Sequence, residues 1–332
     1  MKAMSLANCG DISSHPLKLI DLSPSEPADG DVQIKVHYCG VCRTDLHIVE
    51  GDLNIPELPI IPGHQIVGSI ESIGKNVLKF NIGDRVGVPW MNRTCGKCSF
   101  CTKKNENLCD DVEFTGLHRN GGYAEYTSVP QQFVYPLPEG ISDEQTAPLL
   151  CAGIIGYRTL KLSGIKKGQK LGLYGFGASA HVTIQIANYW DCEVNVFTRS
   201  KDHQKHAEKL GAVWTGTAED DPKVEMDASL IFAPAGWLMA EALKKVRKGG
   251  TVVSAGIHMT DLPEMPYSLL YGEKTLTSAA NATFVDGAEL LHLAAEIPIV
   301  TEVELYPLSE ANKALADLKE SKISGAGVLN VS

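Results

Sequence analysis

The sequence feature that most constrains the fold is a glycine-rich turn in LGLYGFGASAHVTIQIA, residues 171–187. An apolar strand precedes the turn and a helix follows it, and G-x-G-x-x-A spacing is formed by Gly175, Gly177 and Ala180. The first glycine permits a tight turn, the second lets the backbone approach a pyrophosphate, and the small third residue lets helix and strand pack closely. Phosphates would then bind the free N–H groups at the helix N-terminus. The turn therefore predicts dinucleotide binding, and a purely structural glycine turn is the alternative.

The end of the next strand bears on which dinucleotide is bound. An acidic residue at this point usually holds the ribose 2′-hydroxyl. Here the strand at 193–197 runs into Thr198, Arg199 and Ser200, and no carboxylate appears before Asp202. A carboxylate would repel a 2′-phosphate, whereas arginine and serine can donate hydrogen bonds to it. We therefore predict that NADP(H) is favoured over NAD(H); the alternative is that Arg199 stacks on adenine or faces solvent.

The pattern of apolar residues differs before and after residue 150. Beyond it, the pattern predicts strands at 170–174, 193–197, 228–234 and 251–257, and helices at 153–165, 181–190, 203–212 and 238–250, the last ended by Gly249 and Gly250. Such alternation indicates βαβ units and a parallel sheet. Residues 1–148 instead contain short apolar runs broken by Gly, Pro, Asn and Asp, which are typical of a mostly β domain. A further helix is expected at 286–297.

Four cysteines lie close together in CGKCSFCTKKNENLC. Their spacing, C-x2-C-x2-C-x7-C, is formed by Cys95, Cys98, Cys101 and Cys109. Four thiolates this close can converge on one tetrahedral zinc ion, which pins a loop that lacks a core of its own. An iron–sulfur cluster is the alternative, but the ferredoxin run places its fourth cysteine three residues on, followed by proline. Because Cys109 comes later and precedes Asp110, the spacing favours structural zinc.

Composition and charge exclude several classes of protein. The 332 residues exceed one ordinary domain of about 100–200 residues, and 44% apolar content is typical of a folded globular chain. With 30 basic and 40 acidic residues, the formal net charge of −10 argues against a general binder of nucleic acid or anionic membranes. The N-terminus has no signal-peptide pattern, no apolar run is long enough to span a membrane, and nine cysteines is an odd count. We therefore expect a cytoplasmic protein with metal-bound or free thiols.

A second group of potential metal ligands lies in the stretch at residues 39–68. Taken alone, a buried cysteine or histidine is most often a core residue. The motifs that accompany the turn and the quartet are Cys42-Arg43-Thr44-Asp45-Leu46-His47, Gly63-His64-Gln65, and Cys151 just ahead of the βαβ units. With these motifs in this order, the chain resembles the zinc-dependent alcohol dehydrogenases of the medium-chain dehydrogenase/reductase family over essentially its whole length.

The resemblance implies an α/β fold with two domains. A GroES-like, mostly β catalytic domain would span residues 1–149 and 285–332, and a Rossmann domain with a doubly wound parallel sheet would span residues 150–284. It further implies two zinc ions per chain, one catalytic and one structural, and a homotetramer or homodimer. Neither a nucleic-acid partner nor a membrane is expected.

The resemblance also implies a catalytic zinc site. Its ligands would be Cys42, His64 and Cys151, with water or a substrate oxygen in the open fourth position, as is known for alcohol dehydrogenase. Zinc there would lower the pKa of an alcohol or polarise an aldehyde carbonyl, while hydride moves between the carbinol carbon and the nicotinamide ring. The quartet at residues 95–109 would hold the structural zinc.

Roles for four neighbouring residues follow from the same resemblance. Thr44 would accept the substrate hydroxyl proton and pass it through the cofactor ribose toward His47, a surface-facing relay group; the alternative is an ordinary exposed histidine. Asp45 would orient the ligand His64. Arg43 would contact the pyrophosphate.

Two departures from the family pattern and one pocket residue complete the analysis. Gln65 stands where the family usually has glutamate near the metal, and the C-terminal SGAGVL lacks the arginine that often binds pyrophosphate. Trp90 occupies the position of a large aromatic residue that lines the substrate pocket, although it could simply be a core residue. A bulky wall there would favour primary alcohols and aldehydes over branched secondary ones.

The sequence therefore predicts a zinc-dependent alcohol dehydrogenase or aldehyde reductase acting on primary aliphatic or aromatic alcohols and aldehydes. Within the family, a polyol, amino-acid or cinnamyl-type alcohol dehydrogenase is the alternative, since only pocket side chains separate these. A non-catalytic protein that binds zinc and dinucleotide is an alternative of another class. The intact set of Cys42, His64, Cys151 and Thr44 argues against it.

Overall fold

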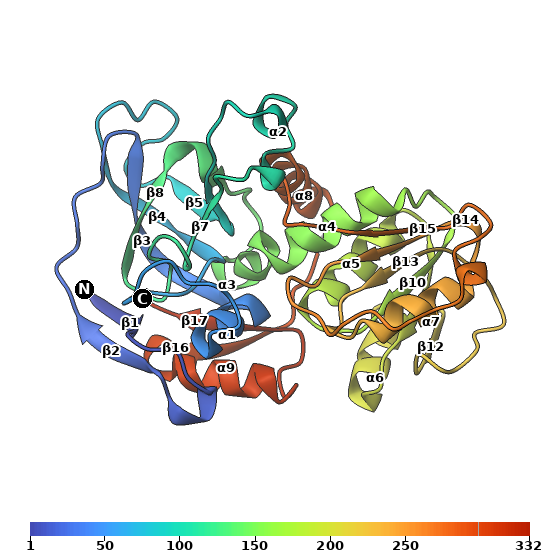
Figure 1. Ribbon diagram of the computed structural model, residues 1–332. Helices are drawn as coiled ribbons and strands as arrows, with labels where there is room; N and C mark the ends of the chain where they lie inside the picture. The colour runs from blue at the N-terminus through green and yellow to red at the C-terminus, as the bar shows by residue number, and fades with distance from the viewer. Residues whose placement is uncertain (298) are drawn as a thin grey trace. The chain divides into compact units, whose positions relative to one another are not determined.

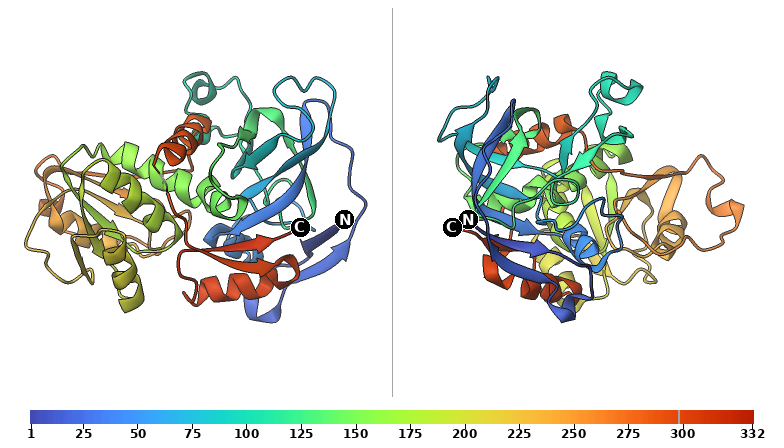
Figure 2. Two further views of the ribbon diagram at one scale, coloured as in Figure 1. Left: turned by 180° about the vertical axis from the view of Figure 1, so that it is seen from behind. Right: turned by 60° about the vertical axis from the view of Figure 1, so that its left-hand side comes forward.

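The computed structural model describes residues 1–297 and 299–332 (Figures 1 and 2). Contacts divide the chain into two compact units. The first contains Met1–Cys151, Thr283–Glu296 and Val300–Ser332, and the second contains Ala152–Ala282 and Ile297–Ile299. Both termini belong to the first unit and lie near each other in all three views. The chain thus leaves the first unit after residue 151 and later returns to it.

The second unit is built on a six-stranded parallel sheet. Its strands are β10 (Lys170–Tyr174), β11 (Glu193–Phe197), β12 (Trp214–Gly216), β13 (Met226–Ile231), β14 (Val246–Ser254) and β15 (Thr275–Ser278). They lie in the order β12-β11-β10-β13-β14-β15, which is the strand order of the Rossmann fold. Strands β10 and β11 are buried at every position after their first residue, because a parallel sheet is covered on both faces.

Helices alternate with most of these strands along the chain, as the pattern predicts (Figure 1). They are α4 (Ala152–Ser163), α5 (Ala178–Tyr189), α6 (Lys201–Lys209) and α7 (Trp237–Lys245). No helix among the described residues is both long enough and apolar enough to cross a bilayer.

The end of α7 differs from the prediction. Gly249 and Gly250 were expected to end this helix, and that expectation is wrong because both lie within β14. The helix stops at Lys245, and Val246 is already extended, with φ −85° and ψ 142°. Val246 pairs with Met226 of β13, and the register of the two strands shifts beyond that pair. Pairing with a distant strand is a tertiary interaction, so the helical period of the local sequence does not report it.

The first unit is mostly β, as predicted. Its main sheet has seven strands, β3 (Asp31–Val41), β4 (Ile66–Ile73), β5 (Arg85–Val88), β8 (Tyr126–Pro130), β9 (Tyr135–Pro136), β16 (Val303–Pro307) and β17 (Ala326–Asn330). Two small sheets are formed by β1 (Lys2–Leu6) with β2 (Leu17–Asp21), and by β6 (Met91–Arg93) with β7 (Glu113–Phe114). Of the main-sheet pairs, β16–β17 is parallel and the others are antiparallel.

Five α-helices accompany these sheets in the described part of the first unit. They are α1 (Arg43–Glu50), α2 (Ser99–Thr102), α3 (Asp143–Thr146), α8 (Phe284–Glu296) and α9 (Ala311–Lys319). The apolar core beneath them includes Ile34, Ile48, Ile66, Val86, Val88 and Leu329, each fully buried. Strand alternation places five of these side chains on the inner face of the sheet, and Ile48 reaches the core from α1. The rigid strands β3, β4 and β5 thereby fix the segments described next.

Candidate active site and metal centres

Two cysteines and one histidine from three distant segments converge in the first unit. Cys42 joins β3 to α1, His64 lies just before β4, and Cys151 follows the 3-10 turn η4 (Ala147–Leu150). Their ligand atoms all lie within 4.8 Å of one another. The two sulfur atoms are 3.9 Å apart, and His64 Nε2 is 3.3 Å from Cys151 Sγ. Zinc–sulfur bonds of about 2.3 Å in a tetrahedron separate two sulfurs by roughly 3.8 Å, so this donor set fits zinc with one position open.

Asp45 holds the histidine of this trio. Its Oδ1 lies 2.9 Å from His64 Nδ1, and neither side chain is exposed to solvent. A carboxylate at Nδ1 fixes the proton there and leaves Nε2 to face the sulfurs. Burial alone would lower the pKa of His64, but the charge and hydrogen bond of Asp45, together with Cys42, raise it to about 10. The other carboxylate oxygen accepts the Cys42 N–H at 2.9 Å, which also caps α1.

The backbone before His64 requires glycine. Gly63 has φ of 98°, and a Cβ atom there would come within 2.4 Å of the Tyr123 ring and 2.9 Å of Cys39 Sγ. Its N–H donates to Asp45 Oδ1 at 3.1 Å. The tight packing of Tyr123 and Cys39 behind Gly63 therefore helps to fix both Asp45 and His64. Burial and then the nearby Asp45 carboxylate raise the pKa of Tyr123 well above its ordinary value, so its hydroxyl stays neutral.

The trio favours a thiolate. The Cys151 thiol donates a hydrogen bond to Cys42, and this bond lowers the pKa of Cys42. Burial raises that pKa and His64 lowers it further, so the pKa of Cys42 lies well below its ordinary value. A thiolate is the form of cysteine that binds zinc. The chemistry of the site therefore agrees with its geometry.

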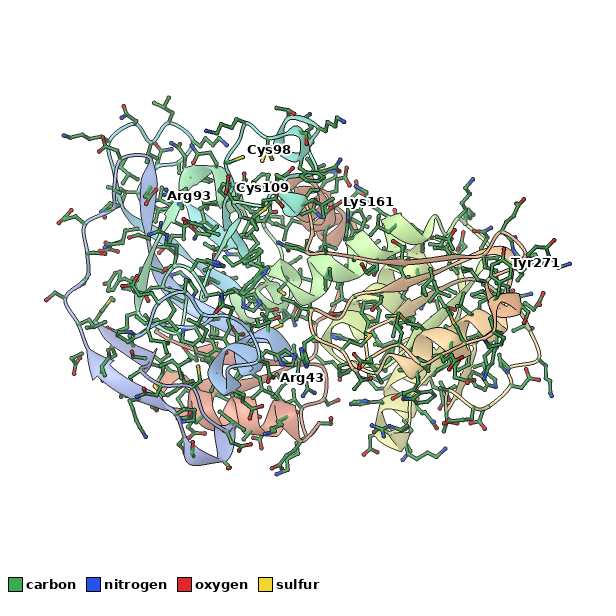
Figure 3. The ribbon with its side chains drawn as sticks, viewed as in Figure 1. Arg43, Arg93, Cys98, Cys109, Lys161 and Tyr271 are labelled. Carbon is green, nitrogen blue, oxygen red and sulfur yellow. The ribbon has the colours of Figure 1, made fainter. Side chains whose placement is uncertain are left out.

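The cysteine quartet forms a second cluster on the first unit, and the predicted convergence is found. Sulfur atoms of all four cysteines lie within 4.8 Å of one another. Cys98 and Cys101 are 3.5 Å apart, and Cys95 and Cys101 are 3.9 Å apart. Figure 3 shows Cys98 and Cys109 in the loop that carries α2. This closed set of four sulfurs fits a structural zinc ion.

Backbone N–H groups point at the sulfurs of the quartet. Donors to Cys95 Sγ include the N–H of Cys98 at 3.3 Å, and the N–H of Cys101 donates to Cys98 Sγ at 3.5 Å. These local bonds stabilise negative charge on sulfur. Backbone hydrogen bonds from Lys97 and Cys98 lower the pKa of Cys95 to about 6. All nine cysteines are free thiols.

Helix α1 carries the predicted relay residues next to the trio. Thr44 and His47 are 9% and 8% exposed, so the expectation of a surface-facing His47 is wrong. The His47 Nδ1 atom lies 2.7 Å from Oδ2 of Asp52, and the Asp52 side chain is 40% exposed. Gly51, with φ of 84°, ends α1 and turns the chain so that the Asp52 N–H donates to the His47 carbonyl. The sequence analysis missed Asp52, although an acidic residue directly after a helix-ending glycine is a visible signal.

Trp90 lies against the trio. Its ring meets the His64 ring edge-on, with centroids 4.7 Å apart, and stacks on Phe114 at 4.6 Å with 10° between the planes. It is 6% exposed, so it is both a packing residue and a neighbour of His64. Gln65, beside His64, is buried with its amide against Gly40 of β3. The structure thus keeps both predicted site neighbours next to His64.

The dinucleotide turn has the expected form in the second unit. Gly175 has φ of 86°, and its N–H donates to the Phe197 carbonyl at 2.8 Å. A Cβ on Gly177 would meet no atom within 4 Å, so the space in front of the α5 N-terminus is open. Ala180 is fully buried, which allows α5 to pack on the sheet. An open turn before an α-helix N-terminus is suited to a pyrophosphate.

The three residues after β11 have different surroundings. Thr198 is half-buried, and its carbonyl accepts a bond from Gln204 Nε2 at 2.8 Å. The Ser200 hydroxyl caps α6 by accepting the His203 N–H at 3.3 Å. Arg199 is exposed and, within the described part of the chain, makes no hydrogen bond or ion pair. Arg199 is therefore the member of this group with a side chain available to a ligand.

Arg43 begins α1 in the first unit (Figure 3). Its Nη2 donates to the Leu318 carbonyl of α9 at 3.4 Å, a long bond that leaves most of the guanidinium donors for other partners.

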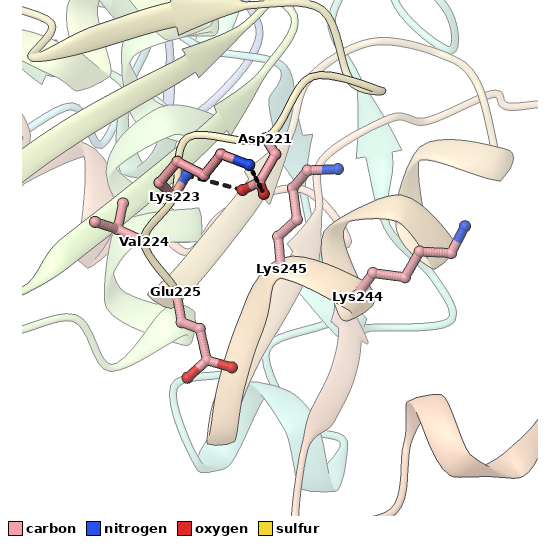
Figure 4. Close-up of a pocket in the computed structure, with 6 residues that line it drawn as sticks. All are labelled: Asp221, Lys223, Val224, Glu225, Lys244 and Lys245. Carbon is pink, nitrogen blue, oxygen red and sulfur yellow. Dashed lines mark hydrogen bonds and ion pairs between the residues drawn. The ribbon is translucent and has the colours of Figure 1, made fainter.

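A surface hollow of about 500 Å³ on the second unit contains none of the predicted site residues (Figure 4). Its lining residues are Asp221, Lys223, Val224, Glu225, Lys244 and Lys245. The charges are largely satisfied, since Lys223 pairs with Asp221 at 2.9 Å and Lys245 donates to the Ala218 carbonyl at 2.7 Å. This hollow adds nothing to the chemistry of the two cysteine clusters.

Comparison with known proteins agrees with this geometry. Residues 28–139 match the model of the alcohol dehydrogenase GroES-like domain. The chain is 42% identical to a probable alcohol dehydrogenase, AdhA, of Mycobacterium tuberculosis, over 99% of this chain and 97% of that protein. It is 33% identical to cinnamyl alcohol dehydrogenase 2 of Arabidopsis thaliana, over 93% of this chain and 87% of that protein. It also resembles the structure of CAD from Helicobacter pylori complexed with NADP(H), at 27% identity and a TM-score of 0.89, over 99% of both chains.

These similarities span nearly the whole chain, and six of the seven residues in the two zinc-site-like clusters lie within residues 28–139, which the family model matches. The chain therefore belongs to the zinc-containing, medium-chain alcohol dehydrogenase family and is an NAD(P)-dependent enzyme of that family.

Proposed function

We propose that this enzyme interconverts primary aliphatic or aromatic alcohols and their aldehydes. The observation that carries the proposal is the convergence of Cys42, His64 and Cys151 next to the Trp90 ring. Residues 1–149 and 285–332 would form the catalytic domain, and residues 150–284 would bind the dinucleotide.

The buried trio would hold the catalytic zinc, and Cys95, Cys98, Cys101 and Cys109 would hold the structural zinc. When bound at the trio, zinc supplies Lewis acidity to the oxygen of the alcohol or aldehyde. The role of the chain is to keep three donors and one open position in place. Asp45 does so for His64 through the 2.9 Å hydrogen bond at Nδ1.

Residues of α1 would handle the proton. Thr44 would accept the hydroxyl proton of the alcohol at its side-chain oxygen, and the proton would then pass by way of the ribose to His47. The contact of 2.7 Å between His47 Nδ1 and Asp52 Oδ2 holds the imidazole ring in one orientation. Arg43, at the start of the same helix, would contact the pyrophosphate. The turn at Gly175, Gly177 and Ala180 in the second unit would bind the dinucleotide through its backbone N–H groups.

NADP(H) is the proposed preferred cofactor. The exposed Arg199 directly after β11, with no carboxylate before Asp202, supports this preference, as does the NADP(H) complex of the similar Helicobacter pylori structure. Thr198 and Ser200 would contribute through their backbone and the capped start of α6. A guanidinium can bind a 2′-phosphate through two hydrogen bonds.

The substrate class is argued from the wall beside His64. Trp90 stacked on Phe114 presents a flat aromatic surface, which suits unbranched chains and planar rings better than branched secondary alcohols. A cinnamyl-type alcohol is the second candidate, favoured by the similarity to the Arabidopsis cinnamyl alcohol dehydrogenase.

The assembly and location of the enzyme are also proposals. A homotetramer or homodimer is carried over from the family. Cytoplasmic localisation is supported by the nine cysteines, all of which the structure describes and none of which forms a disulfide, because disulfides are usual in oxidising compartments.

Nicotinamide absorbance during turnover tests these proposals. NADPH and NADH are compared against acetaldehyde, hexanal, benzaldehyde, cinnamaldehyde and acetone, with wild type and Arg199→Gln. We expect faster turnover with NADPH and with the aldehydes, and a loss of about 10-fold in kcat/KM for NADPH alone in the variant, the size of one charged hydrogen bond. A wild-type preference for NADH would overturn the cofactor proposal, and a preference for acetone would overturn the substrate proposal.

A further inference from the structure

Cys151 is held in position by different contacts from those that hold the other two proposed ligands. Cys42 and His64 are both held by Asp45, which bonds to the Cys42 N–H and to the His64 ring. Cys151 instead directly follows the segment 138–150, which comes after the edge strand β9 and contains α3 and η4. A ligand at the end of such a segment keeps its position only if the segment itself is fixed.

Arg85 of β5 fixes this segment at four points. Its Nε donates to Asp143 Oδ1 at 2.6 Å, and Nη1 donates to the Pro138 carbonyl at 2.7 Å. Its Nη2 donates to the Ile141 carbonyl at 2.8 Å and to Thr146 Oγ1 at 3.2 Å. Only a planar guanidinium can reach a carboxylate, two carbonyls and a hydroxyl at once, so lysine is not equivalent here.

Asp143, which begins α3, is also fixed from the sheet. Its Oδ2 lies 2.7 Å from His37 Nδ1 of β3, and the His37 Nε2 lies 3.1 Å from Ser69 Oγ of β4. The Asp143 side chain is 20% exposed, so the pair is partly shielded from water. Arg85 of β5 and His37 of β3 thereby hold the start of α3, and His37 is itself held by Ser69 of β4.

The end of the segment packs against the strand that carries Arg85, β5. Gly87 lies two residues after Arg85, and a Cβ on it would come within 2.7 Å of the Leu150 side chain and 2.8 Å of that of Leu137. Leu150, directly before Cys151, is 1% exposed. Val88, which follows Gly87 in β5, pairs with Ile66 of β4, and Ile66 lies two residues after His64. Packing against strand β5 therefore fixes the position of Cys151 relative to His64.

We infer that Arg85, with Asp143 and Gly87, is a positioning residue for Cys151 and controls how tightly the trio holds its metal ion. The inference rests on the proposed role of the trio as the catalytic zinc site. Arg85 touches no substrate and no metal ligand; it acts on Cys151 through the segment 138–150.

The chain supplies an internal reference for this inference. The quartet at residues 95–109 is held by its own backbone N–H groups, and none of the Arg85 bonds reaches it. A loss of overall stability would affect both clusters, whereas a loss of positioning would affect the trio alone. Arg247 provides a matched control, since its Nε donates to Asp227 Oδ1 at the same 2.6 Å in the second unit.

Zinc release to a colorimetric chelator separates the two sites. The kinetics are followed in wild type, Arg85→Gln, Arg85→Lys and Arg247→Gln, and a Cys151→Ser variant identifies the phase that belongs to the trio. We expect Arg85→Gln to accelerate that phase by about 10-fold or more, in line with outer hydrogen bonds around metal ligands, and to leave the quartet phase unchanged. Arg85→Lys should fall between wild type and Arg85→Gln, and Arg247→Gln should match wild type.

Equal acceleration of both phases, or no acceleration of the trio phase, would overturn the inference. If Arg85→Gln does not fold, Gly87→Ala provides a second test, because the added methyl group displaces Leu150 without removing a charge. It should accelerate the trio phase alone, and unchanged release from both sites would count against the inference. A wild-type chain that binds only one zinc ion would instead reject the proposed function, so the two failures are distinguishable.

Discussion

The two cysteine clusters of the first unit reach the same chemistry by opposite routes. The quartet takes its four ligands from residues 95–109 and holds them with N–H groups of the same short loop. The trio takes Cys42, His64 and Cys151 from segments far apart in the chain and holds them with Asp45 and with the frame of β3, β4 and β5. A local site stabilises the loop that contains it, whereas the distant site depends on a fold that already exists.

The largest difference should appear when one ligand is removed from each cluster. Cys151→Ser should lower kcat/KM by about 1000-fold or more, because the Lewis acid contributes several kcal/mol, while the melting temperature changes little. Cys101→Ser should lower the melting temperature far more, because the loop has no other core. Calorimetry and steady-state kinetics on both variants check this. If Cys151→Ser melted at a lower temperature than Cys101→Ser, the contrast between the two clusters would be rejected.

Asp45 gives a more graded test. Asp45→Asn preserves shape but removes the carboxylate at His64 Nδ1, so zinc affinity of the trio should fall by about 10- to 100-fold with the quartet unaffected. Competition with a chelator of known affinity measures it, and Asp221→Asn, at an exposed ion pair of the second unit, is the control. Unchanged affinity at both sites would show that the buried carboxylate is dispensable for holding the metal ion.

Trp90 tests whether the trio is also a substrate site, which the quartet is not. Trp90→Leu removes the aromatic wall beside His64, and the kcat/KM ratio of benzaldehyde to acetone should fall by about 10-fold. Trp237→Leu, at a 39% exposed position in the second unit, is the control. An unchanged ratio would assign Trp90 to packing alone.

The smallest effect concerns pH. Burial raises the pKa of Asp143, but the hydrogen bonds and charges of His37 and Arg85 lower it by more. The pKa of Asp143 therefore lies below its ordinary value of 3.8. The resulting stabilisation is fully present above that value and is lost as pH falls through the lower native pKa. Asp143→Asn should therefore unfold about 2 kcal/mol more easily at neutral pH, and the difference from wild type should shrink below about pH 4. Denaturant titrations across pH check this, and a difference that stays constant at low pH would contradict it.

How much the sequence could predict follows the same division. The quartet, the glycine turn and β11 depend on neighbours in the chain, and spacing or periodicity alone predicts them. The trio was predicted only through a family resemblance, since nothing in the local sequence brings residue 151 to residue 42. The end of α7, the burial of His47 and the grip of Arg85 on Asp143 are tertiary events, and local patterns carry no signal for them.

The short sulfur–sulfur distance in the quartet has a practical consequence for handling the protein. With the pKa of Cys95 near 6 and Cys98 3.5 Å from Cys101, this loop is prone to air oxidation once stripped of zinc by a chelator. Two thiols would give up two electrons and two protons to dissolved oxygen, yielding a disulfide and peroxide. Purification without a reductant would then leave a loop that cannot rebind zinc until the disulfide is reduced, and titration of free thiols on stored samples would reveal the oxidised fraction.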